Sequence, residues 1–389
     1  MIYLDNAATS WPKPESVYQA VEQTIRNAGN AGRGANTMSL AASRILVETR
    51  MLLAELFNIP NSERIVFTQN VTEALNLALK GTLNAGDHVV ISPYEHNSVV
   101  RVLEYLRVEV GITYTIAPCH VYDEEDAQFN SNNYTESVLA AFESSIKPNT
   151  KMLCVTHASN VLGTILPIHE LGRLAKSYNL LFLVDAAQTA GIIPIDAQAM
   201  EIDLLAFTGH KGLLGPQGTG GLYVKKDVLI KPLIHGGTGS RSAKLSQPDV
   251  FPDALESGTR NLAGIAGLAA GVRYCLEHIT EIRSHEILLL DKLLAYLQQQ
   301  PHISIYGPTK ATERVGLIAF NASKMLADEL GYVLENQYNI ATRTGLHCSP
   351  LAHASVSTID QGAIRVSVGP FTTESEIDQL IAALGEIIC

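Results

Sequence analysis

Between residues 64 and 224, short apolar runs alternate with longer stretches in which apolar residues recur at helical spacing. This alternation predicts βαβ units, in which parallel strands form one sheet and helices cover both of its faces. The expected strands are Ile65–Phe67, His88–Ile91, Ile112–Ile116, Met152–Thr156, Leu180–Val184, Leu204–Thr208 and Gly221–Val224, and the expected helices are Glu73–Lys80, Val99–Val108 and Ile168–Tyr178.

A different pattern begins at residue 262, where long helices come before short strands. This order predicts a smaller α+β domain after the α/β part of the chain. The expected helices are Leu262–Glu277, Glu286–Gln300 and Glu374–Ile388, and the expected strands are Gly316–Phe320, Ile340–Arg343 and Ile364–Val368.

Two polar stretches interrupt the periodic segments. Gly236–Pro252 has few apolar residues and several Gly and Ser residues, which predicts a long loop. Loops of this length in compact domains are often functional. The acidic, Asn-rich stretch Asp123–Asn133 is expected to be a surface loop with no part in chemistry.

Composition narrows the class of protein. The 389 residues are 46% hydrophobic and 17% charged, which is typical of a globular chain of about two domains. The 39 acidic residues outnumber the 28 basic ones and give a net charge of −11. Nucleic-acid binding requires clustered basic residues, so we expect no nucleic-acid partner. Ordinary solubility accounts for the acidic balance.

The cysteines and the first residues of the chain indicate a compartment. Five cysteines at irregular spacing, with no CxxC pair, predict free thiols and no metal site. Neither a leader at residues 1–5 nor an apolar run of membrane-spanning length is visible, so we expect a cytoplasmic protein.

The first candidate for chemistry is Lys211, which follows the apolar run Leu204–Thr208 inside a Gly-rich turn. A lysine in this place is usually a solvated surface residue. Thr208 and His210 supply polar groups beside it, and the glycines would allow backbone to approach a ligand. A lysine fixed at the end of a strand suits Schiff-base chemistry.

Asp185 ends another apolar run, at the edge of the sheet where open α/β sheets bind ligands. Its carboxylate could simply cap a helix. If Lys211 lies nearby in the same sheet, Asp185 could instead hold the nitrogen of a pyridine ring in the protonated form. Gln188, three residues later, could donate a hydrogen bond to the phenol oxygen of that ring.

Three further segments follow expected strands. Thr72 lies at the start of a helix, where free N–H groups and the helix dipole favour a phosphate, although a simple helix cap fits equally well. His96 could stack on an aromatic ring and transfer protons, or be an ordinary exposed loop histidine. Asn160 could bind a cofactor or substrate oxygen.

Together these segments resemble the class V group of fold-type I pyridoxal-phosphate enzymes, and within it the cysteine desulfurase family. The resemblance extends over nearly the whole chain. It is most specific at Val184–Gln188 and Thr208–Lys211, and it includes the opening Tyr3–Thr9 and the segment Glu256–Thr259. It implies a large pyridoxal-phosphate-binding domain (13–262) with a mostly parallel sheet, and a small α+β domain (1–12 and 263–389).

The resemblance also implies roles in binding pyridoxal 5′-phosphate. Lys211 would be the Schiff-base lysine and the acid–base at the substrate α-carbon, Asp185 would pair with the ring nitrogen, and Gln188 with the ring oxygen. His96 would stack on the ring. The phosphate would be held by Thr72, Thr208 and His210, and by Thr259 reaching across the interface of a homodimer.

The substrate side of the expected site includes Asn160 and Arg365, which would bind the carboxylate of a small amino acid. A guanidinium binds a carboxylate bidentately, which gives Arg365 a physical reason for this role. Arg343–Cys348 resembles the SufS-like branch, whose catalytic cysteine lies on a short ordered loop. Cys348 would then take the sulfur of L-cysteine as a persulfide, and Arg343 and His347 could favour its thiolate.

The other cysteines and one departure from the family pattern complete the expectations. Cys119, Cys154 and Cys275 fit small buried core residues, and Cys389 an exposed terminal one. Asn36 stands where relatives commonly have histidine, which argues against a proton relay at this position. The sulfur-acceptor protein is not identified by the sequence.

Alternatives to the desulfurase activity remain open at this stage. A selenocysteine lyase could use the same residues. In a class V aminotransferase or a β-eliminating lyase, Cys348 would be a bystander. A non-catalytic pyridoxal-phosphate-binding scaffold is a third possibility, against which the intact set of Lys211, Asp185 and Cys348 argues. Fold and cofactor together do not determine the reaction.

Overall fold

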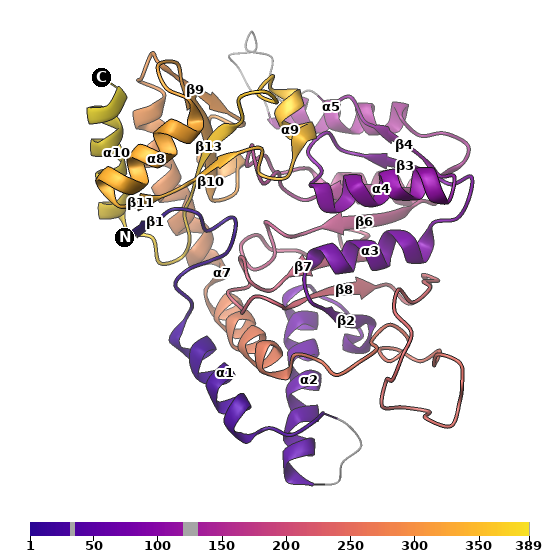
Figure 1. Ribbon diagram of the computed structural model, residues 1–389. Coiled ribbons are helices and arrows are strands. Elements are labelled where there is room, and N and C mark those ends of the chain that lie inside the picture. Colours follow the sequence, from indigo (N-terminus) through magenta and orange to yellow (C-terminus); the bar gives the residue numbers. More distant parts are fainter. Residues whose placement is uncertain (32–35, 120–130, 389) are drawn as a thin grey trace.

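The computed structural model describes residues 1–31, 36–119 and 131–388, and Figure 1 shows how they are arranged. Most of the expected loop at residues 123–133 lies outside the described residues. Its last three residues begin helix α5 (Ser131–Ser144) instead of continuing the loop. Among the described residues, no helix combines the length and apolar character needed to cross a membrane.

A seven-stranded sheet forms the centre of the large domain. Its order is β2-β8-β7-β6-β5-β3-β4, and the neighbours from β7 to β4 are parallel. β8 is antiparallel to both of its neighbours, so six strands share one direction and the expected mostly parallel sheet is confirmed. The strands are β2 (Ile65–Thr68), β3 (His88–Ile91), β4 (Thr113–Ile116), β5 (Thr150–Thr156), β6 (Leu181–Asp185), β7 (Leu204–Thr208) and β8 (Gly220–Val224).

The sheet is apolar on both faces because helices cover both of them. Along β6, Phe182 and Val184 belong to one hydrophobic cluster, whereas Leu183 belongs to the cluster on the opposite face. Side chains of a strand alternate between faces, so a strand covered on both sides has to be apolar throughout. The helices that follow strands β2, β3 and β5 are α3 (Val71–Thr82), α4 (Asn97–Glu109) and α6 (Ile168–Ser177).

The small domain is built on a four-stranded antiparallel sheet of order β12-β13-β10-β9. The expected strand at 340–343 is wrong as one element. It divides into β11, which pairs in parallel with β1, and β12, which pairs with β13. The elements are β1 (Ile2–Tyr3), β9 (Ile303–Tyr306), β10 (Leu317–Ala322), α8 (Ala327–Tyr338), β11 (Ile340–Ala341), β12 (Arg343–Gly345), α9 (Pro350–Ser355), β13 (Ala363–Ser367) and α10 (Glu374–Ile388).

One helix, α7 (Leu262–Leu297), replaces the two helices expected between residues 262 and 300. The segment between them contains neither Gly nor Pro, and Ile282 within it is buried, so the helical hydrogen bonds continue without a break. Figure 1 shows α7 running from the α1–α2 region of the large domain to the small domain. Helices α1 (Glu15–Asn27) and α2 (Thr37–Leu56), which were not expected, pack against α7.

Candidate active site

Lys211 lies just past the end of β7, on a turn whose backbone is fixed by hydrogen bonds at this residue. Its carbonyl oxygen accepts hydrogen bonds from Ser10 Oγ at 2.9 Å and from the Leu214 N–H at 2.8 Å. Burial and the positive charge of Arg365 lower the pKa of the Lys211 amine to about 8. The amine is therefore a better nucleophile at neutral pH than an exposed lysine.

The N-terminal segment provides contacts to this turn that the sequence did not predict. The carbonyl oxygen of His210 accepts hydrogen bonds from the Ser10 N–H at 3.0 Å, from Thr9 Oγ1 at 3.1 Å and from Lys13 Nζ at 3.0 Å. Burial lowers the pKa of Lys13 to about 8. The only signal for these contacts was the run of small and polar residues after the first strand.

The glycines beside Lys211 have a different role from the one expected. A Cβ on Gly209 would lie 2.1 Å from Thr219 Oγ1, and one on Gly212 would lie 2.5 Å from the Ala190 carbonyl oxygen. The close approach that these glycines allow is to neighbouring protein segments. They are therefore required for packing of the Lys211 turn, whereas the sequence suggested close approach to a ligand.

Asp185 ends β6, which pairs in parallel with β7, so both side chains rise from the same edge of the sheet. The carboxylate is buried and its Oδ1 accepts the Ala187 N–H at 2.9 Å. Burial raises the pKa of Asp185, while the neighbouring Lys211 charge opposes this rise. Gln188 Nε2 donates to the Ala7 carbonyl oxygen at 3.2 Å, and Gln188 and Lys211 line one cavity.

His96 and Thr72 are connected through Ser98, a residue that the sequence did not single out. Thr72 Oγ1 lies 2.7 Å from Ser98 Oγ, which lies 2.9 Å from His96 Nδ1. The Ser98 N–H donates to His96 Nδ1 at 3.0 Å, so the neutral ring carries its proton on Nε2. Burial and the Lys211 charge lower the pKa of His96 to about 4, which keeps the ring neutral.

Two more of the expected phosphate ligands lie at the end of β7. Thr208 is buried, and its Oγ1 lies 3.5 Å from the Thr219 carbonyl oxygen, which leaves the hydroxyl weakly bonded. His210 has a buried Nδ1 with no hydrogen-bond partner. Burial lowers the pKa of His210 to about 4. Both side chains therefore retain hydrogen-bonding capacity for another group.

Arg365 in β13 joins the N-terminal segment to the loop that contains Asn160. Its Nη1 donates to the Asn160 carbonyl oxygen at 2.9 Å, and its Nη2 donates to Asp5 Oδ1 at 2.8 Å. The buried Nε has no partner. Arg343 in β12 lies directly opposite Arg365 in the antiparallel ladder. The charges of both arginines lower the pKa of Lys211.

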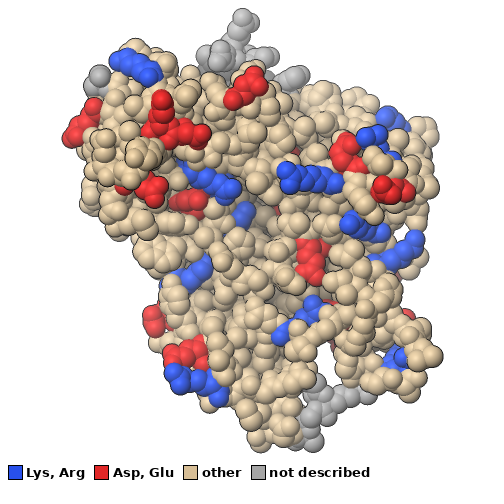
Figure 2. Space-filling view, in the orientation of Figure 1, with Lys and Arg blue, Asp and Glu red and all other residues tan. Residues whose placement is uncertain are grey.

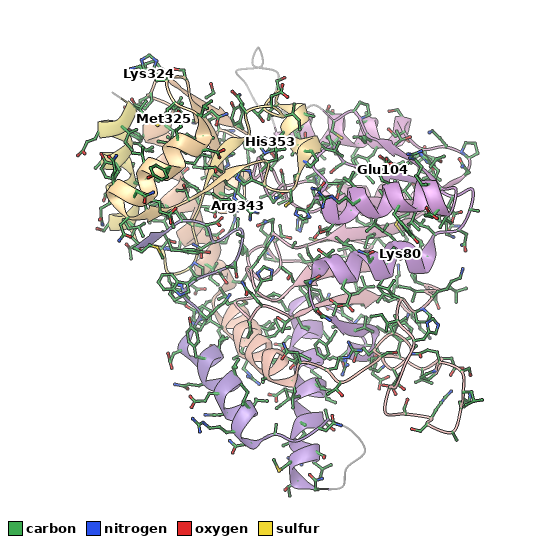
Figure 3. The ribbon with its side chains drawn as sticks, viewed as in Figure 1. Lys80, Glu104, Lys324, Met325, Arg343 and His353 are labelled. Atoms are coloured by element: carbon green, nitrogen blue, oxygen red, sulfur yellow. The ribbon has the colours of Figure 1, made fainter. Side chains whose placement is uncertain are left out.

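The two arginines lie on the side of the small domain that faces the large domain. Figure 3 shows Arg343 in the gap between the small-domain strands and helices α3 and α4. Figure 2 shows basic side chains, with acidic ones among them, around the hollow at the same place. The positive charges of Arg343 and Arg365 near Lys211 favour an anionic ligand, such as an amino-acid carboxylate or a phosphate.

Cys348 is exposed on a short loop between β12 and α9, and its backbone has a positive φ of 59°. His347 before it is buried and also has a positive φ of 50°. The Cys348 carbonyl oxygen accepts the Asn97 N–H at 2.8 Å, at the start of α4 and next to His96. The loop therefore brings the Cys348 backbone to the part of the large domain that contains the expected cofactor ligands.

His347 does not supply the positive charge that the sequence suggested for the Cys348 thiolate. Burial and the Arg365 charge lower its pKa to about 3, and burial lowers the pKa of His353 to about 4. The two neutral rings form a chain of hydrogen bonds. The Arg343 carbonyl oxygen can only accept, so His347 donates to it (3.4 Å) and accepts at Nδ1 from His353 (3.5 Å). His353 in turn accepts at Nδ1 from Thr358 (2.7 Å). Of the two residues expected to favour the Cys348 thiolate, only Arg343 remains as a source of positive charge.

Some predicted residues lie elsewhere. Thr259 is exposed and lines a groove of about 550 Å³ with Arg50 and Glu256, not the cavity beside Lys211, so its contact across a dimer stays a prediction. Asn36 caps α2 by accepting the Ser39 N–H at 2.9 Å, which gives this residue a structural role. Cys119, Cys154 and Cys275 are buried as expected, and Cys389 lies outside the described residues.

The arrangement fits pyridoxal phosphate. A partly buried amine of lowered pKa stands beside a buried carboxylate, and the unpartnered His210 Nδ1 marks an incomplete hydrogen-bonding site. The described residues contain no cluster of His, Cys, Asp or Glu side chains suited to a metal ion.

Comparison with known proteins supports this assignment. The aminotransferase class-V family model matches residues 2–380. Cysteine desulfurases of Yersinia pestis and Yersinia pseudotuberculosis are 34% identical over 400 residues, which cover 100% of this chain and 93% of each relative. The chain therefore belongs to the aminotransferase class-V family, whose members are pyridoxal-phosphate-dependent enzymes of fold type I.

Solved structures give the same fold. The apo cysteine desulfurase from Thermococcus onnurineus NA1 superposes with a TM-score of 0.87 at 29% identity, covering 100% of this chain and 94% of that one. A cysteine desulfurase from Escherichia coli gives a TM-score of 0.85 at 27% identity, covering 99% and 94%. Within its family, the chain is thus similar to cysteine desulfurases in sequence and in structure.

Proposed function

We propose that this protein is a cysteine desulfurase that converts L-cysteine into L-alanine and takes the sulfur onto Cys348 as a persulfide. The observation that supports this proposal most directly is the position of Cys348. Its exposed thiol is on a small-domain loop whose backbone is bonded to the residue after His96. A lysine–aspartate pair alone would serve any class V reaction, whereas sulfur transfer requires a thiol at this place.

Each residue of the site has a part in binding the cofactor. Lys211 would hold pyridoxal phosphate covalently, with Asp185 at the ring nitrogen, Gln188 at the ring oxygen and His96 against the ring face. Thr72, Thr208 and His210 would bind the phosphate. When bound, the cofactor supplies an electron sink for charge that develops at the substrate α-carbon.

The remaining residues act on the substrate. Arg365 and Arg343, with Asn160, would bind the carboxylate and orient the α-carbon toward Lys211. The Lys211 amine would take the α-proton, because its lowered pKa leaves a large neutral fraction near pH 8. His96 would keep its proton on Nε2 and donate a hydrogen bond from this atom.

Sulfur transfer then involves Cys348. Its thiolate attacks the substrate sulfur, so that a sulfur–sulfur bond forms while the Cβ–S bond breaks. The electron pair of the broken bond goes to Cβ, which gains a proton and becomes the methyl group of alanine. The persulfide on Cys348 then passes to an acceptor or is reduced by a thiol. A homodimer and a sulfur-acceptor protein are further parts of this proposal.

Product identification tests the proposal. The holoprotein is incubated with L-cysteine and a thiol reductant, and alanine, pyruvate and sulfide are each quantified. We expect alanine and sulfide in equal amounts. Pyruvate with sulfide would identify a β-eliminating lyase. Turnover of selenocysteine alone would identify a selenocysteine lyase, and turnover only with an amino-group acceptor would identify an aminotransferase.

Two variants separate the roles of the lysine and the cysteine. Cys348→Ala is expected to bind the cofactor normally and to lose persulfide formation, as measured by mass spectrometry of the protein after reaction with L-cysteine. Lys211→Ala is expected to lose covalent cofactor binding. Persulfide formation that persists in Cys348→Ala would contradict the assignment of the thiol.

A further inference from the structure

Asn160 contacts both peptide neighbours of Cys348. Its Nδ2 donates to the His347 carbonyl oxygen at 2.7 Å, and its Oδ1 accepts a hydrogen bond from Ser349 Oγ at 2.6 Å. The carbonyl oxygen of His347 can only accept, so the amide has one orientation. The side chain of Asn160 thus makes one contact on each side of the cysteine.

The backbone at this point requires such support. His347 and Cys348 are consecutive residues other than glycine with positive φ, a conformation that costs free energy for side chains with a Cβ. Such a conformation persists only where surrounding contacts hold it. Here the contacts include the two from Asn160, the hydrogen bond from the Asn97 N–H to the Cys348 carbonyl oxygen, and the one from the Ser349 N–H to the Leu346 carbonyl oxygen.

Burial makes the Ser349–Asn160 contact strong. Ser349 is fully buried, and Asn160 is 9% exposed. A buried hydrogen bond whose loss leaves its acceptor unpaired has a larger effect than one at the surface. The Asn160 backbone carbonyl also accepts Arg365 Nη1 at 2.9 Å. One residue therefore connects the Cys348 loop with the arginine that would bind the substrate carboxylate.

We propose that Asn160 and Ser349 form a clamp that positions Cys348 and couples its loop to Arg365. In the clamp both act as positioning residues, because they hold the chain on either side of the cysteine. The clamp itself follows from the contacts of the protein alone, whereas its effect on sulfur transfer rests on the proposed function. Replacing Ser349 tests the positioning role without removing the Asn160 side chain, which could itself contact a ligand.

The test uses Ser349→Ala, with Ser355→Ala as the matched control. Ser355 Oγ in α9 also makes one hydrogen bond, to the Ala352 carbonyl oxygen at 2.7 Å, but has no contact with Asn160. Amide hydrogen exchange of Asn97 and of residues 346–349 is measured on the purified full chain. We expect exchange about tenfold faster in Ser349→Ala, which corresponds to one buried hydrogen bond, and unchanged exchange in Ser355→Ala.

A second variant and a kinetic readout make the test specific. Asn160→Ala should accelerate the same amides, and adding Ser349→Ala to it should have little further effect, because the two residues share one bond. In the holoenzyme, Ser349→Ala should lower kcat for sulfur transfer about tenfold and leave KM for L-cysteine within twofold.

The outcomes distinguish the clamp from the proposed function. Exchange in Ser349→Ala that equals the wild-type rate would overturn the clamp, as would full additivity with Asn160→Ala. Faster exchange in a protein that transfers no sulfur from L-cysteine would support the clamp and overturn the proposed function. If Ser349→Ala does not fold, Asn160→Asp keeps the acceptor for Ser349 but loses the donor to His347. Exchange of residues 346–349 at the wild-type rate in this variant would overturn the clamp.

Discussion

The Nη2 atom of Arg365 in β13 lies 2.8 Å from Oδ1 of Asp5, a residue separated from it by almost the whole chain. This contact joins the N-terminal segment to the small-domain sheet at the edge of the site. Arg365 is 1% exposed, so its charge is compensated within the protein. Arg365 donates from Nη1 to the Asn160 carbonyl oxygen and from Nη2 to Asp5 at the same time. A lysine has a single side-chain nitrogen and cannot reproduce this geometry.

Arg365→Lys is therefore expected to impair substrate binding. A single ammonium cannot bond to Asp5, to the Asn160 carbonyl oxygen and to a carboxylate together, so KM for L-cysteine should rise about tenfold or more. Steady-state kinetics measure this change. The control is Arg283→Lys, since Arg283 also bonds to backbone carbonyl groups, but at residues 311–314. An equal rise in KM for both variants would contradict the role of Arg365.

The lowered pKa of Lys211 leads to a prediction about cofactor capture. Only the neutral amine attacks an aldehyde, and its pKa is about 8 in place of the ordinary 10.5. The rate at which the cofactor-free protein binds pyridoxal phosphate, followed by absorbance, should rise with pH and level off above about pH 8 to 9. A rate that still rises steeply through pH 10 would contradict the burial of this amine. Lys211→Ala serves as the control.

The Arg50–Glu256 ion pair predicts a non-additive effect on stability. Arg50 Nη2 lies 2.7 Å from both oxygens of Glu256, Oε1 of which also accepts the Phe67 N–H, and both side chains are buried. Removing Arg50 leaves the buried Glu256 carboxylate with the longer 3.7 Å contact to Arg260 Nε in place of this ion pair, so Arg50→Met should lower the free energy of unfolding by about 3–5 kcal/mol.

The double variant Arg50→Met/Glu256→Leu should recover much of that loss, because neither charge remains. Urea denaturation measures all three variants. The exposed Arg273–Glu48 pair is the control, and breaking it should change the free energy of unfolding by less than about 1 kcal/mol. Additive losses at Arg50 and Glu256 would show that the pair is not coupled.

Glu286 predicts a pH dependence of stability. The side chain is 1% exposed, its Oε2 has no partner, and burial raises its pKa from 4.5 to about 8. The unfolded chain releases this proton above about pH 4.5, so the contribution of Glu286 to stability is present below that pH and is lost as pH rises toward 8.

Glu286→Gln removes this titration. Its free energy of unfolding should exceed that of the wild type by an amount that grows between about pH 4.5 and 8 and then stays constant, reaching a few kcal/mol. Thermal or urea unfolding at several pH values measures the difference. The exposed Glu277→Gln is the control. A difference that does not vary with pH would show that Glu286 is ionised in the folded protein.

Local sequence patterns predicted most of the central sheet. Strands such as β6 and β7 are apolar along their whole length because both faces are covered, and that pattern is visible in the sequence. The break expected near residue 280 was wrong. Residues 278–285 include Thr280 and Ser284 but neither Gly nor Pro, and α7 continues through them.

The candidate site could be predicted as a set of residues but not as a network. Lys211, Asp185 and Cys348 follow from their motifs. Ser98, Ser10 and Ser349 could not be found, because a serine has no sequence signature for the partner that its hydroxyl will meet. The neutral state of His347 was missed for a related reason, since only the fold determines its burial.

The continuity of α7 has a mechanical consequence. A helix of 36 residues is about 54 Å long and resists both bending and compression. It packs against α1 and α2 in the large domain and against α10 in the small domain, so one uninterrupted helix connects the two domains. A change in the distance between the two domains along this helix would therefore require backbone hydrogen bonds of α7 to break.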